Sequence, residues 1–546
     1  MAMHGLEEVA FLRSPVAHAR LVAIRKPHGL ERQVVLRGDM PEARDIEGNS
    51  GLPSYKHSAQ PPLAQDKIRF VGEPIALAFA PTRAQAEDIA ERVDIEFAEL
   101  PAIPDVRTSR EIAAHTRVHE HWEDNTFLTL HADKRFAELS AKASVVVRRH
   151  IDLSRQCMVP LEGKAVLAYW DERLDQLIVY SATQIPHLIR NGLSQVLGLD
   201  SAMVRVIAPD VGGGFGYKGM LHQEEVCIAW LAWKYRKPFR FVEDRREHLI
   251  VGANSRQHHY EMVGYADERG RLLALDARLA IDGGAYSVSP FTIGLEPGQA
   301  LGNLPGPYAF EGYRCTVECL ATNKPGFMPY RGVARTGVCF AMELLIDAIA
   351  REVGREPWEV RKENLVPAAA MPYVNVMNKH FDSGDYPASL QEVRGMIDFD
   401  GVRSRQRRER AGGQAASRRV GVGFATYTEQ SAHGASVFAT WGTPFVPGFD
   451  SATVRIMPDG SVEIRVGVQS HGQGMETTFA QIVHEILGVE LARIKMVHGD
   501  TGLTPFSTGT YASRSLVMSG GAVSRACKTL VPRLKYIAAH LLQRSA

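Results

Sequence analysis

The sequence has little net charge, few cysteines and no long hydrophobic run. Lysine and arginine together number 63 and aspartate and glutamate 62, which gives a net charge of +1 in 546 residues. This balance gives no electrostatic reason to expect nucleic acid or a membrane as a partner. No apolar stretch is long enough to span a bilayer, and the chain does not start with the basic and apolar segments of a signal peptide. The six cysteines show no iron–sulfur spacing, so we expect reduced thiols in a cytoplasmic protein.

The length of the chain predicts several domains, because a single core seldom serves more than about 300 residues. Strand-like and helix-like segments are mixed along the chain, which favours an α+β fold. Changes in composition suggest the following division: a small domain at 1–105, a linker at 106–129, a second domain at 130–370, a connecting segment at 371–420 and a third region at 421–546.

Local patterns predict several elements within this division. Apolar residues at helical spacing predict a helix that ends at Gly354; they are Val338, Met342, Leu345 and Ile349. Turn residues at 268–270 and 458–460 predict two hairpins. The arginine-rich stretch at 402–419 predicts a solvated loop, with a nucleic-acid-binding patch as the alternative.

Two junctions join a strand to a helix through glycines. In the first, at 212–219, the residues Gly214–Gly219 fit the pattern G-x-G-x-x-G. The pattern alone leaves three alternatives open: a structural turn, a dinucleotide site in which Glu243 or Asp244 holds a ribose, or a site for another ligand. The second junction, at 472–474, opens a predicted helix. Two such junctions in separate regions suggest one ligand held from both sides.

Longer segments narrow these alternatives. They are "SATQIPHLIRNGLSQVLGL" (181–199), "DVGGGFGYKG" (210–219), "TNKPGFMPYRGVARTG" (322–337), "SHGQGMETT" (470–478) and "GDTGLTPFSTGTYASRS" (499–515). In this order they resemble the molybdenum-binding large subunits of the xanthine oxidase family, especially the bacterial carbon monoxide dehydrogenase-like and aldehyde oxidase-like members. Residues 11–21 and 69–80 resemble the family's α/β-hammerhead domain. The resemblance implies a hammerhead domain followed by two molybdopterin-binding α+β regions, the second incomplete.

The resemblance also implies a chemistry and a set of partners. Members of this family hydroxylate carbon with water as the oxygen source, at a molybdenum ion held by the dithiolene of a molybdopterin. A glutamate acts as the base. Bacterial relatives usually carry the cytosine dinucleotide form of the pterin. Electrons leave through 2Fe-2S centres and FAD, so we expect an iron–sulfur subunit and an FAD subunit as partners, and a small molecule as substrate.

The motifs assign site residues by resemblance. Gln184 is expected to bond to an oxygen ligand of molybdenum, and Gly214, Phe215 and Gly216 to lie beside the metal, where the glycines leave room for it. Arg331 is expected to face the substrate and to stabilise developing negative charge. The other expected cofactor residues form two groups: Gly472, Gln473 and Gly474 in the first, and Tyr511, Ala512, Ser513, Arg514 and Ser515 in the second.

Departures from the family pattern limit the substrate and the base. Gly332 stands where the carbon monoxide enzymes have a copper-binding cysteine, and Gly219 where xanthine-type enzymes have a glutamate. These positions favour an aldehyde or an N-heteroaromatic ring as substrate. The catalytic glutamate of the family has no counterpart here, and Glu73, although flanked by Gly72 and Pro74, matches a different segment. We therefore expect a second chain to complete the molybdenum domain and supply the base. The alternatives are an inactive truncated product and a nicotinamide-dependent dehydrogenase that uses Gly214–Gly219.

Overall fold

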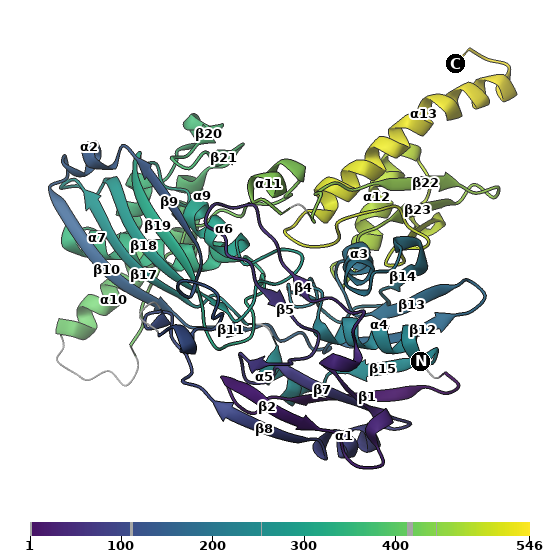
Figure 1. Cartoon of the computed structure of the whole chain (residues 1–546). Coiled ribbons are helices and arrows are strands. Elements are labelled where there is room, and N and C mark those ends of the chain that lie inside the picture. Colours follow the sequence, from purple (N-terminus) through teal and green to yellow (C-terminus); the bar gives the residue numbers. More distant parts are fainter. Residues whose placement is uncertain (1–2, 110–112, 253, 412–418, 444, 546) are drawn as a thin grey trace.

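The computed structural model describes residues 3–109, 113–252, 254–411, 419–443 and 445–545. Helices and strands are mixed throughout, which confirms the predicted α+β class. Figure 1 shows the N-terminal strands at the bottom, a large sheet on the left and the last residues at the upper right, where α13 extends from the body. No helix in the described part of the chain is long and apolar enough to cross a membrane.

The N-terminal strands belong to the same sheet as strands from the second predicted domain. The seven strands of this sheet are, in order, β14 (Val204–Ile207), β13 (Gln176–Ser181), β12 (Ala165–Asp171), β15 (Phe239–Val242), β1 (Glu7–Arg13), β7 (Pro74–Ala80) and β3 (Val34–Leu36). The pairing of β1 with β15 is parallel. The sheet therefore continues across the predicted boundary at residue 105.

Helices cover this sheet and a smaller sheet lies beside it. The helices that contact it are α1 (Arg83–Glu91), α3 (Pro186–Leu197) and α4 (Gln223–Tyr235). α4 is buried over most of its length, as expected for a helix within a large core. The smaller sheet consists of β6 (Lys67–Ile68), β2 (Ala19–Arg25) and β8 (Asp94–Glu99). Short strand pairs are formed by β4 (Ile46–Glu47) with β5 (Ala59–Gln60) and by β11 (Gln156–Cys157) with β16 (Asn254–Ser255).

A five-stranded sheet forms the centre of the second domain. Its strands are, in order, β10 (Val145–Leu153), β17 (His258–Ala266), β18 (Leu272–Gly284), β19 (Gly312–Ala321) and β9 (Thr126–Lys134). The helices on this side are α2 (Phe136–Ser140), α6 (Leu295–Asn303), α7 (Ala334–Glu352) and α8 (Pro357–Asn364). β17 and β18 form the hairpin predicted at 268–270. α7 buries the four apolar residues that predicted it, because that face packs on β10 and β17.

The two segments predicted to be irregular contain ordered structure. Within the predicted linker at 106–129, Val118 and Trp122 are buried and β9 begins. The connecting segment holds β20 (Tyr373–Val374), β21 (His380–Phe381), α9 (Tyr386–Met396) and α10 (Phe399–Ala411). The predicted loop at 402–419 is thus wrong up to residue 411, because arginine, glutamine and glutamate favour helix; residues 412–418 lie outside the described residues.

The described part of the third region contains a small sheet and three helices. Its elements are α11 (Ala435–Thr440), β22 (Ala452–Ile456), β23 (Val462–Val466), α12 (Met475–Leu487), β24 (Ile494–Val497) and α13 (Gly521–Leu542). β22 and β23 form the hairpin predicted at 458–460. A π-helical turn at Ser515–Gly520 leads into α13, which packs on α12 and β22. Further along α13, Leu534, Ile537 and Leu541 are exposed in the described chain.

An ion-pair cluster fastens β1 to the helices above it. The Arg13 guanidinium contacts Glu224 of α4 at 2.8 Å and Glu247 of α5 (Arg245–Val251) at 2.6 Å. All three side chains are largely buried, so the two carboxylates depend on one cation.

We expect Arg13→Met to lower the free energy of unfolding by about 3 kcal/mol, because it leaves two nearly buried carboxylates without their cation. Urea denaturation of the whole chain measures the change. The matched control is Arg25→Met, which removes an exposed pair with Asp94 and Glu96 and is expected to have no measurable effect. Equal losses in the two variants would contradict the role of Arg13.

Candidate functional site

Gln184 lies where three of the predicted motifs meet. It follows β13 and precedes α3. Its Oε1 accepts a hydrogen bond from the Gly216 amide at 2.9 Å, and its Nε2 donates to the Thr510 carbonyl at 2.8 Å. The glycine turn (residues 212–219) and the Tyr511 loop (residues 508–515) are therefore joined through one buried side chain.

The glycines of this turn allow close contact with other protein segments. Gly216 has φ +110°, and a Cβ there would collide with the Pro329 carbonyl. A Cβ on Gly214 would lie 2.5 Å from Gln184 Oε1. The sequence predicted that these glycines make room for a ligand. At the sites of these two Cβ atoms the structure instead shows protein atoms, so both glycines are needed to assemble the site.

Arg331 belongs to a loop that lies on the glycine turn. We call residues 329–333 the Arg331 loop. The Arg331 amide donates to the Phe215 carbonyl at 2.9 Å, and both side chains are exposed. The Arg331 guanidinium makes no hydrogen bond or ion pair with any residue that the structure describes. A cation without a partner, placed beside the turn, is available to a ligand.

Arg256, which no sequence pattern indicated, anchors the Arg331 loop. Its guanidinium lies 4.3 Å from the centre of the Tyr330 ring and donates to the Tyr330 and Arg331 carbonyls. It also donates to Gln156 at 2.9 Å. A single arginine next to a short strand carries no pattern, so only the three-dimensional contacts reveal this role.

The second glycine junction borders the first. We call residues 470–474 the Gln473 loop. Gln469, just before it, donates from Nε2 to the Pro209 carbonyl at 2.9 Å, which lies just before the glycine turn. Gly472 and Gly474 have φ +98° and +77°, and a Cβ on either would meet nothing within 4 Å. This loop therefore opens α12 with open space around both glycines; that it holds one ligand together with the glycine turn stays a prediction.

The Tyr511 loop presents polar groups that the described protein does not satisfy. Ala512 and Ser513 both have φ +50°, an uncommon conformation for residues other than glycine. The Tyr511 hydroxyl and the Thr508 hydroxyl are buried and have no partner at good hydrogen-bond geometry in the described chain, although each lies close enough to interact with the other. Because buried polar groups are nearly always satisfied, a polar ligand beside this loop would find two further partners.

Arg514 connects this loop to the segments around His433 and Asp450. Its Nη1 lies 2.9 Å from both carboxylate oxygens of Asp450, and the guanidinium also donates to the carbonyls of His433, Gly448 and Gly509. Its side chain is fully buried. Arg514 thus holds the loop in place, and its partner Asp450 was not foreseen. The Ser515 hydroxyl oxygen lies 3.5 Å from the Thr510 hydroxyl oxygen.

A molybdopterin fits the residues that these loops present. The glycines of the Gln473 loop leave open space beside the start of α12. The first amides of a helix favour an anion, and among those of α12 the Glu476 amide is already bonded to its own carboxylate. The hydroxyls of the Tyr511 loop add polar groups, as does the buried Nε2 of His471, which has no partner in the described chain.

The carboxylates considered for other roles are already engaged. Glu243 accepts hydrogen bonds from Tyr217 and His248, and Asp244 caps α5. Neither is free to hold a ribose, which removes the support for a dinucleotide in the glycine turn. Glu73 is fully buried and accepts from the Tyr286 hydroxyl at 2.8 Å, so it is not available as a base.

Comparison with known proteins agrees with this geometry. Residues 118–365 and 392–546 match two family models described as molybdopterin cofactor-binding domains, and residues 1–101 match the a/b hammerhead domain of aldehyde oxidase and xanthine dehydrogenase. The carbon monoxide dehydrogenase large chain of Hydrogenophaga pseudoflava is 30% identical over 99% of this chain and 69% of its own length. The chain belongs to the molybdenum-binding large subunits of the xanthine oxidase family. The resemblance seen in the sequence is thereby confirmed.

Other relatives of this family differ in what their names say they act on. The nicotine 6-hydroxylase large subunit of Paenarthrobacter nicotinovorans is 30% identical over 99% of this chain and 66% of its own length. The solved structure of quinoline 2-oxidoreductase from Pseudomonas putida 86 superposes with a TM-score of 0.94 at 33% identity, over all of this chain and 69% of that one. The chain therefore spans about two thirds of the length of these relatives.

We expect Gly216→Ala to cost about 3 kcal/mol of folding free energy, because the new Cβ meets the Pro329 carbonyl in a strained backbone conformation. Urea denaturation measures this loss. Gly395→Ala is the control: that position is in α9 with open space around it, and alanine there is expected to stabilise the helix by about 0.5–1 kcal/mol. If Gly216→Ala were as stable as the wild type, the close contact with the Arg331 loop would not exist.

Proposed function

We propose that this chain forms the molybdenum site of a hydroxylase or dehydrogenase that oxidises an aldehyde or an N-heteroaromatic carbon with water as the oxygen source. The observation that carries the proposal is the position of Gln184, which joins the glycine turn to the Tyr511 loop. The nicotine and quinoline enzymes named among the relatives act on N-heteroaromatic compounds, which supports that substrate class.

The cofactor we propose is a molybdopterin, in its cytosine dinucleotide form. When bound, it would supply a two-electron acceptor and an activated oxygen derived from water. The Gln473 loop would hold its anionic part, because the glycines and the start of α12 offer backbone donors. Tyr511, Ala512 and Ser513 would line its other side.

The residues of the chain would orient the reacting groups. The second N–H of Gln184 Nε2 would bond to an oxygen ligand of the metal, because the first donates to the Thr510 carbonyl. The Gly216 amide would keep Gln184 in position through its hydrogen bond to Oε1, with Phe215 beside them. Arg331 would stabilise negative charge that develops on the substrate, since its guanidinium has no other partner in the described chain. Gly332 offers no thiol for copper, which counts against carbon monoxide as the substrate.

The electron acceptors would lie on other chains. Glu73 and Glu243 are engaged elsewhere, so we assign the proton transfer to neither of them and propose another glutamate as the base. Electrons would pass to an iron–sulfur subunit with 2Fe-2S centres and then to an FAD subunit. All six cysteines are free thiols, which supports our proposal of a reducing, cytoplasmic setting.

Elemental analysis of the chain purified with its co-expressed partner subunits tests the function. We expect molybdenum in the complex and substrate-dependent dye reduction with aldehydes or N-heteroaromatic compounds. A complex without molybdenum would refute the proposal. Molybdenum without turnover of any substrate would favour an inactive product. A raised melting temperature with NAD would favour the dehydrogenase alternative, because a ligand stabilises the state that binds it.

We expect Arg331→Ala in this complex to lower kcat/KM by about 100-fold, the size of effect seen when one group that stabilises transition-state charge is lost. Molybdenum content should stay unchanged, because the proposed role of Arg331 is towards the substrate. Arg331→Lys is expected to recover part of the activity. Arg173→Ala, which removes an exposed arginine from the turn between β12 and β13, serves as the control. Loss of molybdenum in Arg331→Ala would assign this residue to the cofactor.

A further inference from the structure

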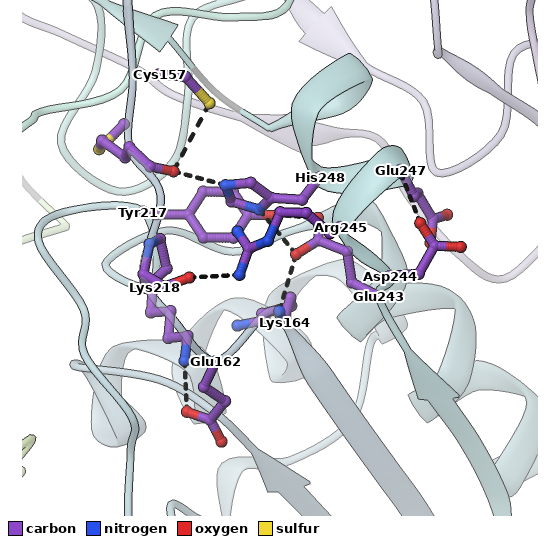
Figure 2. Close-up of polar contacts among 12 residues, drawn as sticks. Cys157, Glu162, Lys164, Tyr217, Lys218, Glu243, Asp244, Arg245, Glu247 and His248 are labelled. Carbon is purple, nitrogen blue, oxygen red and sulfur yellow. Dashed lines mark hydrogen bonds and ion pairs between the residues drawn. The ribbon is translucent and has the colours of Figure 1, made fainter.

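A buried network lies behind the glycine turn and is not part of the site described above (Figure 2). Its centre is Glu243, which follows β15. One carboxylate oxygen accepts from the Tyr217 hydroxyl at 2.5 Å. The other accepts from His248 Nδ1 at 2.9 Å and from the Lys164 amide at 2.9 Å. Glu243 therefore connects the glycine turn, through Tyr217, to His248 of α5.

Both ring nitrogens of His248 face acceptors. Nδ1 faces Glu243, and Nε2 lies 2.6 Å from the Met158 carbonyl. The side chain is completely buried. A neutral imidazole carries one N–H, so it could satisfy only one of these oxygens, whereas an imidazolium donates to both.

Electrostatics favour the charged form. Burial lowers the pKa of His248, but the nearby Cys157 thiol and the hydrogen bond and charge of Glu243 outweigh it and raise the pKa from 6.5 to about 9. Burial also raises the pKa of Glu243, but hydrogen bonds from His248 and Tyr217 lower it below its usual value. The two residues thus form a charged pair that is buried, so solvent does not screen the attraction between them.

The glycine turn depends on such anchors. Glycine has little conformational preference of its own, so Gly214 and Gly216 do not define the direction of their peptides. Tyr217, the next residue, is held at two points: its carbonyl faces His222 Nε2 at 2.8 Å, and its hydroxyl is held by Glu243. Its ring packs edge-on against His248 with 4.6 Å between centroids.

We propose that His248 is a positioning residue that stays protonated and, through Glu243 and Tyr217, fixes the Gly216 amide against Gln184. Only the consequence for catalysis rests on the proposed molybdenum function. The network itself is a property of the chain alone. Its role is to hold the amide that keeps Gln184 in position, from a place that touches neither substrate nor cofactor.

The charge on His248 can be observed directly. In the whole chain labelled with ¹⁵N-histidine, long-range ¹H–¹⁵N spectra distinguish protonated from bare ring nitrogens, and His248→Gln identifies the signal. We expect both nitrogens of His248 to carry protons at pH 7.5. His150→Gln, which removes an exposed histidine of β10, should leave this signal unchanged. A bare nitrogen on His248 at pH 7.5 would overturn the proposal.

The pH dependence of stability gives a second readout. Because the folded pKa is above the unfolded value of 6.5, the stabilisation is complete below about pH 6.5 and is lost as pH rises through about 9. The titratable groups that face the ring are Glu243, Tyr217 and Cys157, so the comparison is made in a Cys157→Ser background. We expect the stability difference between His248 and His248→Gln to shrink between pH 6.5 and 9. A constant difference would overturn the proposal.

Tyr217→Phe tests the positioning role, because it removes one hydroxyl and keeps the ring. In the holoenzyme we expect kcat per bound molybdenum to fall about tenfold while KM stays within twofold. Tyr235→Phe, at the end of α4, is the control. A merely structural role would lower the molybdenum content but leave kcat per molybdenum unchanged, and would overturn the positioning role. If the wild-type complex bound no molybdenum, the proposed function would fail, but the spectra of His248 would still decide its charge.

Discussion

The site depends on the hydrogen bonds of one residue, Gln184. Its side chain accepts from the Gly216 amide and donates to the Thr510 carbonyl. Its backbone accepts from the Thr510 amide and donates to the Lys218 carbonyl. Two segments from different domains are therefore held in register by four groups of a single residue. An amide side chain suits this position, because it offers a donor and an acceptor without adding a charge.

Charges are concentrated behind the loops that carry the site. Lys218 pairs with Glu162 at 2.6 Å, and Lys164 with Glu225 at 2.7 Å, with both lysines almost fully buried. Arg514 is held by Asp450 in the same way. Removing charges from water is costly, and the gain of a buried pair barely exceeds that cost. We therefore infer that these ion pairs select one backbone conformation of the loops. The loops contain many residues with positive φ and have little conformational preference of their own.

The sequence predicted what local patterns encode. The spacing of Val338, Met342, Leu345 and Ile349 identified α7, because one face of that helix lies against a sheet. The two hairpins were predicted from their turn residues, because these residues are neighbours in the sequence. The pairing of β1 with β15 was not predicted, since contacts between distant segments leave no periodic trace. The mistaken loop at 402–411 arose from reading charge as disorder, although arginine and glutamate also favour helix.

For the site, the motifs located the loops but not the groups that hold them. Gly216 was attributed to space for a ligand, whereas its Cβ position is occupied by the Pro329 carbonyl, a neighbour that no local pattern indicates. Arg256, Asp450 and Glu162 were missed because a single charged residue has no spacing to recognise. Their contacts become visible only when the chain is folded.

Charged residues have two different roles near these loops. Most are paired and hold the loops in place, whereas one is left without a partner. Gly472 and Gly474 have open space around them, while Arg514, Lys218 and His248 are each paired with a carboxylate. Arg331 is the exception, since its guanidinium is exposed beside Phe215 and has no partner in the described chain. A fixed cation is worth most where charge develops during a reaction and least where it is already paired. The ion pairs of the other three residues therefore leave Arg331 as the cation beside the glycine turn that has no partner in the described chain, and this is the reason for the role that we propose for it.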